Sequence, residues 1–300
     1  MGLPLVALPV VAYPMNSADS AAGAANWRLD ALAALRERDP VSKAACVRAL
    51  HERVQAGIER GELHWDAPRT LDAPADLPGR PARPELVDPR QLQRRSMSKP
   101  HGRAVLLHAL AHIEFNAINL ALDAVWRFPA MPDAFYADWL GVAAEEGYHF
   151  SLLAARLADY GHAYGDFPAH NGLWEMCERT QDDVLARMAL VPRVLEARGL
   201  DAAPPIRARL KQAGDDASAA ILDVILRDEV GHVRIGNRWF RYLCERRGLD
   251  PHAAWLALAE QYRAPKMRGP FNFEARRSAG FDDAELDALA AQDAQEEGAG

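Results

Sequence analysis

The sequence predicts an all-α protein whose centre is a four-helix bundle. The motif Glu-x-x-His occurs twice, at residues 146–149 and 229–232, each time inside a long stretch of helical apolar periodicity. A single glutamate precedes each motif by a similar interval, which is 32 residues for Glu114 and 33 residues for Glu196. That interval corresponds to half a helix, a turn and half of the next helix. The chain is therefore predicted to contain two helical hairpins that pair into the bundle.

Residues 1–62 are predicted to form an extension with two helices. The first is expected to begin at a cap among Asn16, Ser17 and Asp19, because these side chains can accept the free N–H groups of a helix start. Asp39, which precedes a proline, is expected to begin the second helix. The apolar residues of this second helix recur at spacings of three and four, as in a buried helical stripe: Val47, Leu50, Val54 and Ile58.

Residues 63–101 differ in kind and are predicted to be a proline-rich connector. Proline lacks a backbone N–H and its ring clashes with the preceding helical turn, so proline at this density excludes long helices. The connector is expected to wrap the core, because it carries four apolar side chains: Leu71, Leu77, Leu86 and Val87.

Residues 102–262 are predicted to form the bundle itself. In its third helix, Pro192 is expected to produce a kink and Gly199 to end the helix, with residues 201–205 as the following turn. Residues 263–300 are predicted to be a tail that consists of a loop and a short final helix. The four bundle helices are expected at residues 103–128, 134–160, 173–197 and 215–247.

The two motifs predict a metal site in the bundle core. A spacing of three residues brings both side chains to one face of an α-helix, so each motif offers a carboxylate and an imidazole to one ion. Both motifs interrupt apolar stripes, and buried carboxylates must be paired or must coordinate a metal. We expect two iron ions, with manganese as the alternative. The predicted ligands are Glu114, Glu146, His149, Glu196, Glu229 and His232.

An acidic residue precedes the glutamate of each motif. A metal-bound imidazole usually donates its other N–H to a carboxylate, which fixes the orientation of the ring. Asp228 is therefore predicted to support His149 across the bundle, and Glu145 to support His232. The alternative is that both acids lie on the surface at the edge of the apolar stripe.

Other side chains compete with these assignments. His108 and His112 have a spacing that also suits a metal, but Glu114 fits the interval to the first motif. His112 is expected to be a core histidine or a neighbour of the site, and His108 to lie near the surface. Glu178 is the main rival of Glu196 on the third helix.

Aromatic residues near the motifs are candidates for the wall of a substrate chamber. Tyr148 lies inside the first motif and is a candidate redox-active or hydrogen-bonding neighbour of the metals, with a structural role as the alternative. For the group as a whole, core packing is the competing interpretation. Its members are Phe115, Trp139, Tyr148, Phe150 and Trp239.

Three strings carry a family resemblance: Ala-His-Ile-Glu-Phe-Asn-Ala at residues 111–117, Leu-Glu-Ala-Arg-Gly-Leu-Asp at 195–201 and Asp-Glu-Val-Gly-His-Val at 228–233. With the ligand pattern, they resemble the ferritin-like superfamily of di-iron carboxylate proteins and, more narrowly, the uncharacterised bacterial family DUF455. The resemblance covers roughly residues 75–285. It implies a ferritin-like bundle and the six ligands above, but no reaction. A more distant similarity, to the tRNA-hydroxylating di-iron enzymes, is limited to the ligand pattern.

Composition limits the classes of partner and compartment. The formal net charge is −7, so nothing in the overall charge favours nucleic acid or a membrane surface. The three cysteines are far apart, which suits a reducing cytoplasm. The apolar run at residues 3–14 has no preceding basic residue and contains three prolines, so it is not expected to be a secretory signal. A cytoplasmic protein is predicted, and a homodimer is compatible with the sequence.

These features lead to one main hypothesis of function. Two carboxylate-bound irons can react with O₂, so we expect an O₂-dependent di-iron oxidase or hydroxylase. The substrate would be a small molecule or a modified nucleoside, and an electron donor would be required; the sequence identifies neither. The alternatives are a metal-handling ferroxidase or peroxide-scavenging protein, and a non-enzymatic metal-binding bundle. No residues are assigned to an organic cofactor.

Overall fold

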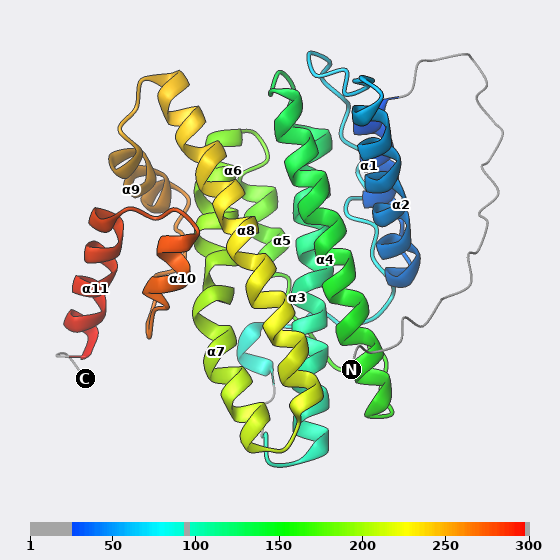
Figure 1. Cartoon of the computed structure of the whole chain (residues 1–300), viewed down its shortest axis with the longest axis vertical. Helices are drawn as coiled ribbons and strands as arrows, with labels where there is room; N and C mark the ends of the chain where they lie inside the picture. The colour runs from blue at the N-terminus through cyan, green and yellow to red at the C-terminus, as the bar shows by residue number, and fades with distance from the viewer. Residues whose placement is uncertain (1–25, 93–96, 298–300) are drawn as a thin grey trace.

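The computed structural model describes residues 26–92 and 97–297, and over these residues the chain is helical without a β-strand (Figure 1). The predicted all-α class is therefore confirmed. In chain order the elements are α1 (Trp27–Arg36), α2 (Pro40–Glu59), the short 3₁₀ helix η1 (Pro89–Gln91), α3 (Pro100–Arg127), α4 (Asp133–Asp159), α5 (Gly172–Arg179), α6 (Val184–Leu190), the π-helical segment η2 (Val191–Glu196), α7 (Ala197–Gln212), α8 (Asp216–Arg247), α9 (Pro251–Gln261), α10 (Phe273–Ser278) and α11 (Asp283–Glu297).

The N-terminal helices α1 and α2 pack on α3 and α4. The expected cap residues Asn16, Ser17 and Asp19 lie outside the described residues, and Asn26 caps α1 instead by accepting from two backbone N–H groups. Arg28 then fixes α1 to the bundle. Its buried guanidinium donates to the carbonyl oxygen of Trp126 at 2.7 Å, which satisfies a free carbonyl at the end of α3.

The connector between α2 and α3 contains no helix longer than η1 among its described residues. It lies against the core through the buried side chains of Trp65 and Leu71. It also pairs with the loop after α4, because Val87 donates its backbone N–H to the carbonyl of Ala169 at 2.8 Å. The connector therefore lies along the bundle, although Leu86, one of the four apolar residues expected to hold it there, is 40% exposed. The division of the chain into four regions stays a prediction.

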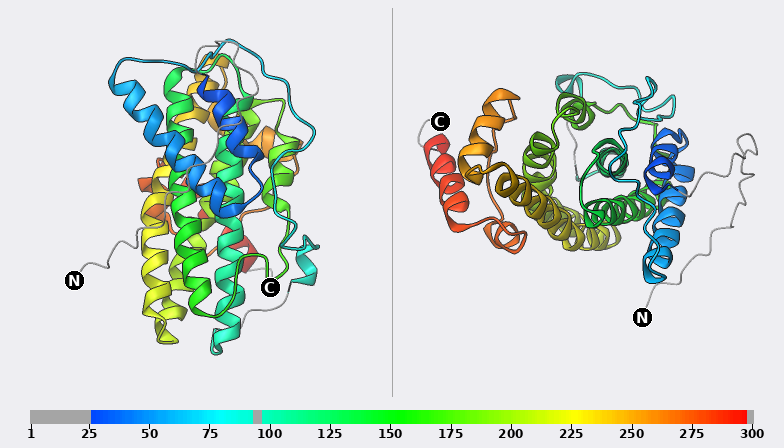
Figure 2. Two further views of the ribbon diagram at one scale, coloured as in Figure 1. Left: turned by 90° about the vertical axis from the view of Figure 1, so that its right-hand side faces the viewer. Right: turned by 90° about the horizontal axis from the view of Figure 1, so that it is seen from above.

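The bundle consists of α3, α4, the continuous rod formed by α6, η2 and α7, and α8 (Figure 1). α3 packs along α4, α7 packs along α8, and α4 contacts α8 between the two pairs. The view from above in Figure 2 places α1 and α2 on one side of the bundle and α9 to α11 on the other. The first, second and fourth bundle helices begin and end within three residues of their expected bounds.

The prediction of one third helix over residues 173–197 is wrong. A break after α5 separates it from α6, where Asp183 caps a new helix by accepting from the backbone N–H of Leu185 at 3.0 Å. The rod then continues through Gly199 and through residues 201–205, which were expected to be a turn. Pro192 removes one helical hydrogen bond, and the wider π-helical turn of η2 accommodates this loss without ending the helix.

Gly199 lies inside this rod and does not end it. A Cβ at Gly199 would lie 4.0 Å from the carboxyl carbon of Glu229, so this glycine lies directly beside a predicted ligand. A Cβ at Gly236 of α8 would overlap the side chain of Pro192. Gly236 therefore lets α8 approach η2 closely, and both elements carry predicted ligands.

One helix is long and apolar enough to cross a membrane by length and composition. It is α3, and 78% of its most apolar window is buried inside the protein. Such burial is typical of the core helix of a soluble protein. The cytoplasmic location itself stays a prediction.

Candidate metal centre

The six predicted ligands come from four elements and meet in the bundle core. Glu114 lies on α3, residues 146 and 149 on α4, Glu196 at the end of η2, and residues 229 and 232 on α8. All six side chains are buried. The ring centroids of the two histidines are 5.8 Å apart. Side chains that are up to 118 positions apart in the chain thus share one polar interior.

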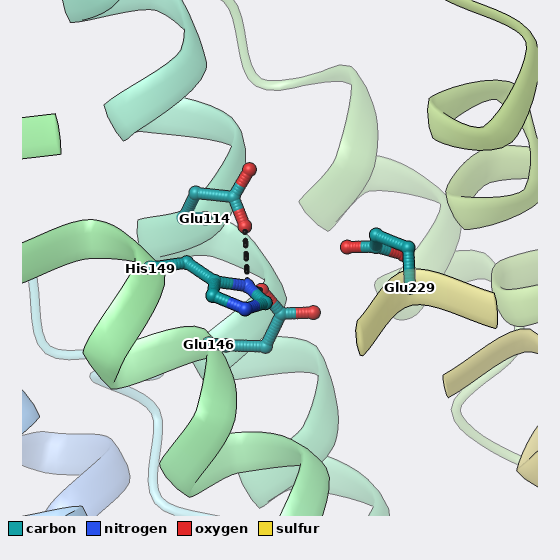
Figure 3. A group of neighbouring side chains, drawn as sticks. All are labelled: Glu114, Glu146, His149 and Glu229. Carbon is teal, nitrogen blue, oxygen red and sulfur yellow. Dashed lines mark hydrogen bonds and ion pairs between the residues drawn. The ribbon is translucent and has the colours of Figure 1, made fainter. Parts of the chain in front are cut away.

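Four of these residues form a compact group that could hold a metal ion. Each offers one ligand atom, and these atoms lie within 4.8 Å of one another: Glu114, Glu146, His149 and Glu229. Figure 3 shows their side chains converging from the two hairpins on a shared space. Nδ1 of His149 lies 3.4 Å from an oxygen of Glu114, the contact drawn as a dashed line.

Glu146 lies between the two imidazoles. Its Oε2 is 3.4 Å from Nδ1 of His149, and its Oε1 is 3.0 Å from Nδ1 of His232. Each oxygen of one carboxylate therefore faces a different histidine. Glu146 would therefore contact a cation bound beside either imidazole.

Glu229 and Glu196 complete the second half of the group. Oε1 of Glu229 lies 3.8 Å from Nδ1 of His232. Neither carboxylate oxygen of Glu196 has a hydrogen-bond partner among the described residues. Burial raises the pKa of Glu196 to about 8, and the nearby carboxylates of Glu229 and Glu146 add to this shift. A buried carboxylate without a partner is costly, and a cation would remove that cost.

The outer nitrogen of each imidazole contacts a carboxylate from the opposite hairpin. Nε2 of His149 lies 3.1 Å from Oδ2 of Asp228, and Nε2 of His232 lies 2.6 Å from Oε2 of Glu145. With Nε2 engaged in this way, Nδ1 is the atom that each ring presents to the interior. The side chain of Glu145 is otherwise largely at the surface.

The electrostatics of the group favour a bound cation. Burial and the charge of Glu146 raise the pKa of Glu114 well above its usual range. Burial opposes the charged form of His149, but the carboxylates of Glu114 and Glu146 outweigh it and raise the pKa of the imidazole to about 11. In the metal-free protein these shifts favour a proton on Glu114 and on Glu196 near neutral pH. A bound cation would replace these protons, because carboxylate ligands must be deprotonated.

His112 is turned away from this group. Its Nδ1 lies 2.8 Å from the hydroxyl of Tyr164, and its Nε2 lies 3.0 Å from the carbonyl oxygen of His170. It therefore anchors the loop after α4. The expectation that His108 lies near the surface is wrong, because the same loop buries it and the backbone N–H of Gly165 donates to its Nε2 at 2.9 Å.

The candidate aromatic residues do not gather around one chamber. Tyr148 is 52% exposed and points away from the bundle interior. Phe115 and Phe150 are buried and pack together, with their ring centroids 5.8 Å apart. Trp239 packs on Phe135 and donates its indole N–H to a carboxylate. Core packing, the competing interpretation, describes the buried members of this set.

Glu178, the rival of Glu196, lies outside the buried group, and the π-helical segment η2 that carries Glu196 was not predicted. Glu178 is exposed and accepts a hydrogen bond from the indole of Trp174 at 2.9 Å. Sequence reasoning missed the π-helical turn of η2, which ends at Glu196. The available signal was Pro192, four residues before Glu196, in a pattern that otherwise remained helical.

Comparisons with known proteins cover most of the chain. The family model described as "Protein of unknown function (DUF455)" matches residues 36–287. An uncharacterized protein of Haemophilus influenzae is 46% identical over 262 residues, which are 85% of this chain and 90% of that protein. No solved structure matches the chain.

Proposed function

Since the chain belongs to the DUF455 family, whose function is unknown, we propose a function from the site itself: an O₂-dependent oxidase or hydroxylase with two iron ions in the bundle core. The observation that carries this proposal is the position of Glu146, with one carboxylate oxygen facing each of two imidazoles. Manganese is the alternative metal, because carboxylate and imidazole ligands accept both ions. The ligand arrangement also supports the ferritin-like assignment.

The proposed ligands divide into two sets that share Glu146. Glu114 and His149 would hold one ion, and their ligand atoms are 3.4 Å apart. Glu229 and His232 would hold the other ion together with Glu196, whose two free oxygens are explained by a cation. The donor set contains only oxygen and imidazole nitrogen, and none of the three cysteines belongs to it.

Two iron ions bound here would supply the electrons that reduce O₂. A hydroxylation would insert one oxygen atom into a substrate C–H bond and release the other as water, using two electrons and two protons from an external donor. The chain's own residues have separate tasks. Asp228 and Glu145 hold the imidazoles in place, and the apolar side chains around the ligands limit the access of water. The substrate, a small molecule or a modified nucleoside, and the electron donor remain part of the proposal.

Metal analysis of anaerobically purified protein tests the ligand set. We expect about two iron ions per chain, in keeping with the two-ion sites of such bundles. The variants Glu146→Ala and His232→Ala should lose metal, whereas Glu178→Ala, an exposed glutamate of α5, should keep it. Full metal content in both ligand variants would overturn the proposal.

Exposure of the loaded protein to O₂ tests the chemistry. The optical spectrum should change once, as the two bound ions react with O₂ in a single turnover. Without a reductant, O₂ uptake should then stop. Continued uptake in the presence of excess ferrous iron would instead indicate a ferroxidase. A loaded protein whose spectrum does not respond to O₂ would contradict both activities.

A further inference from the structure

The proposed ligands differ in how far solvent reaches them. The side chains of Glu146 and of both histidines are fully buried, with 0% of their surface exposed. The side chains of Glu114 and Glu229 are 5% and 10% exposed, and Glu196 as a residue is 8% exposed. These three carboxylates come from α3, α8 and η2. The group is therefore closest to solvent on a side that α4 does not form.

Packed elements cover the other sides of the ligand group. On α4, a Cβ at Gly147 would lie 3.4 Å from the Cα of Ala44, so α2 lies directly against this helix, and α4 also contacts α8. On the outer side of α7 and α8, a second apolar cluster fills the contact with the segment from α10 to α11; it includes Leu200, Val233 and Phe281. α5 packs on both α3 and η2. The described parts of α3 and α7 do not pack along each other, so the seam between these two helices is the side that remains.

Gly199 of α7 leaves an unfilled space beside the carboxylate of Glu229. It lies one helical turn after Glu196 and is partly exposed. Apart from its chain neighbours and the backbone of its own helix, a Cβ at Gly199 would meet one atom within 4 Å, the carboxyl carbon of Glu229. Oε2 of Glu229 is buried and has no hydrogen-bond partner among the described residues. An unpartnered carboxylate oxygen next to an unfilled space indicates a position where a further group binds.

The helix positions next to this space are apolar. Leu110 precedes Glu114 by one turn of α3, and Ile206 follows Gly199 by two turns of α7. Both are partly buried and pack against the core. Ile113, the residue before Glu114, is 42% exposed. Sites for small organic molecules are lined mainly by apolar side chains, and none of these positions carries a basic group that could pair with a phosphate.

We propose that the substrate reaches the metal centre through the seam between α3 and α7, and that Gly199 limits its size by leaving room for its reacting part beside Glu229. The substrate class is a small, uncharged and largely apolar molecule. This inference rests on the proposed function, because it requires metal ions at the ligand group. Gly199 acts here as a specificity-determining residue, since a larger side chain would grow into the space beside Glu229.

Optical titration of the iron-loaded, oxidised full chain with two probes tests the proposal. Azide is a slim ligand of ferric iron, and phenol is an uncharged aromatic molecule whose oxygen also binds ferric iron. We expect both to bind to the original chain. In Gly199→Leu, phenol should bind at least about tenfold more weakly, because the new side chain fills the space, whereas azide should bind as before. Ala208→Leu, exposed on the opposite face of α7, is the control and should bind both probes like the original chain.

The outcomes separate this inference from the proposed function. Equal phenol affinities in Gly199→Leu and the original chain, or an equal loss in Ala208→Leu, would overturn the role of Gly199. An original chain that binds azide but not phenol would overturn the substrate class, whereas absence of bound iron would contradict the proposed function itself. If Gly199→Leu takes up no iron or no azide, Gly199→Ala decides, because its Cβ makes only ordinary contact with Glu229. That variant should keep iron and azide but bind phenol more weakly, and undiminished phenol binding would contradict the proposal.

Discussion

Oδ2 of Asp228 lies 3.1 Å from Nε2 of His149, although 79 residues separate them in the chain. Glu145 makes the reciprocal contact with His232 at 2.6 Å. Each hairpin thus holds the imidazole of the other hairpin. Because both outer nitrogens are engaged, both Nδ1 atoms face the core, where each lies near the carboxylate of Glu146.

This relationship predicts the effect of Asp228→Asn. The amide keeps the size of the side chain but loses the charge that orients the ring and raises its basicity. Metal affinity should fall by about 10–100-fold. The measurement is competition with a chelator of known affinity, and Glu245→Gln, an equivalent change at an exposed position of α8, is the control. Equal affinities in the two variants would show that Asp228 does not support the site.

Glu196 predicts a pH dependence for the metal-free protein. Burial and neighbouring carboxylates raise its pKa from 4.5 to about 8. Between these values the folded state binds more protons than the unfolded state, so the stability that this group contributes is present below about pH 4.5 and is lost as the pH rises through about 8. The free energy of unfolding, measured with urea, should decrease by a few kcal/mol at most as the pH rises across this range.

Glu196→Gln is the variant that isolates this effect. Without a titrating group at this position, the slope of stability against pH should be smaller in the metal-free variant than in the original chain. Glu178→Gln, on exposed α5, should leave the slope unchanged. An identical slope for all three proteins would mean that Glu196 does not titrate in this range.

The proximity of the predicted ligands and the positions of three bundle helices could be predicted from the sequence for a local reason. Spacing within a helix fixes which side chains share a face, so Glu146 and His149 could be paired without knowledge of the fold. The repeated interval to Glu114 and to Glu196 then supplied the connection between helices. Apolar periodicity was enough to place α3, α4 and α8.

The errors arose where distant packing decides the local structure. Gly199 reads as a helix end, but it lies beside Glu229 inside a continuous rod. His108 reads as a surface residue, but the loop at Gly165 covers it. Neither contact leaves a periodic signal in the sequence.

Manganese(II) should stabilise the protein if the buried group binds metal. An ion that binds only the folded state adds about 2.7 kcal/mol at a concentration of 100 times its Kd. The melting temperature of metal-free protein should therefore rise with added manganese and fall again with a chelator. In Glu146→Ala the rise should be absent, because the carboxylate that faces both imidazoles is missing. A rise of the same size in that variant would place the binding elsewhere.

Gly236→Ala tests whether the contact between α8 and η2 positions the site. The new Cβ would overlap the side chain of Pro192, so the helices must separate, at a cost of about 1–3 kcal/mol. Displacement of η2 should also move Glu196 and weaken the binding of one of the two ions. Gly231→Ala is the matched control on the same helix, because a Cβ there meets no atom within 4 Å and should stabilise α8 by about 0.5–1 kcal/mol. Thermal melts and metal titrations of both variants measure the two effects. If the Gly236 variant is less stable but keeps full metal affinity, the packing of η2 against α8 does not position the metal site.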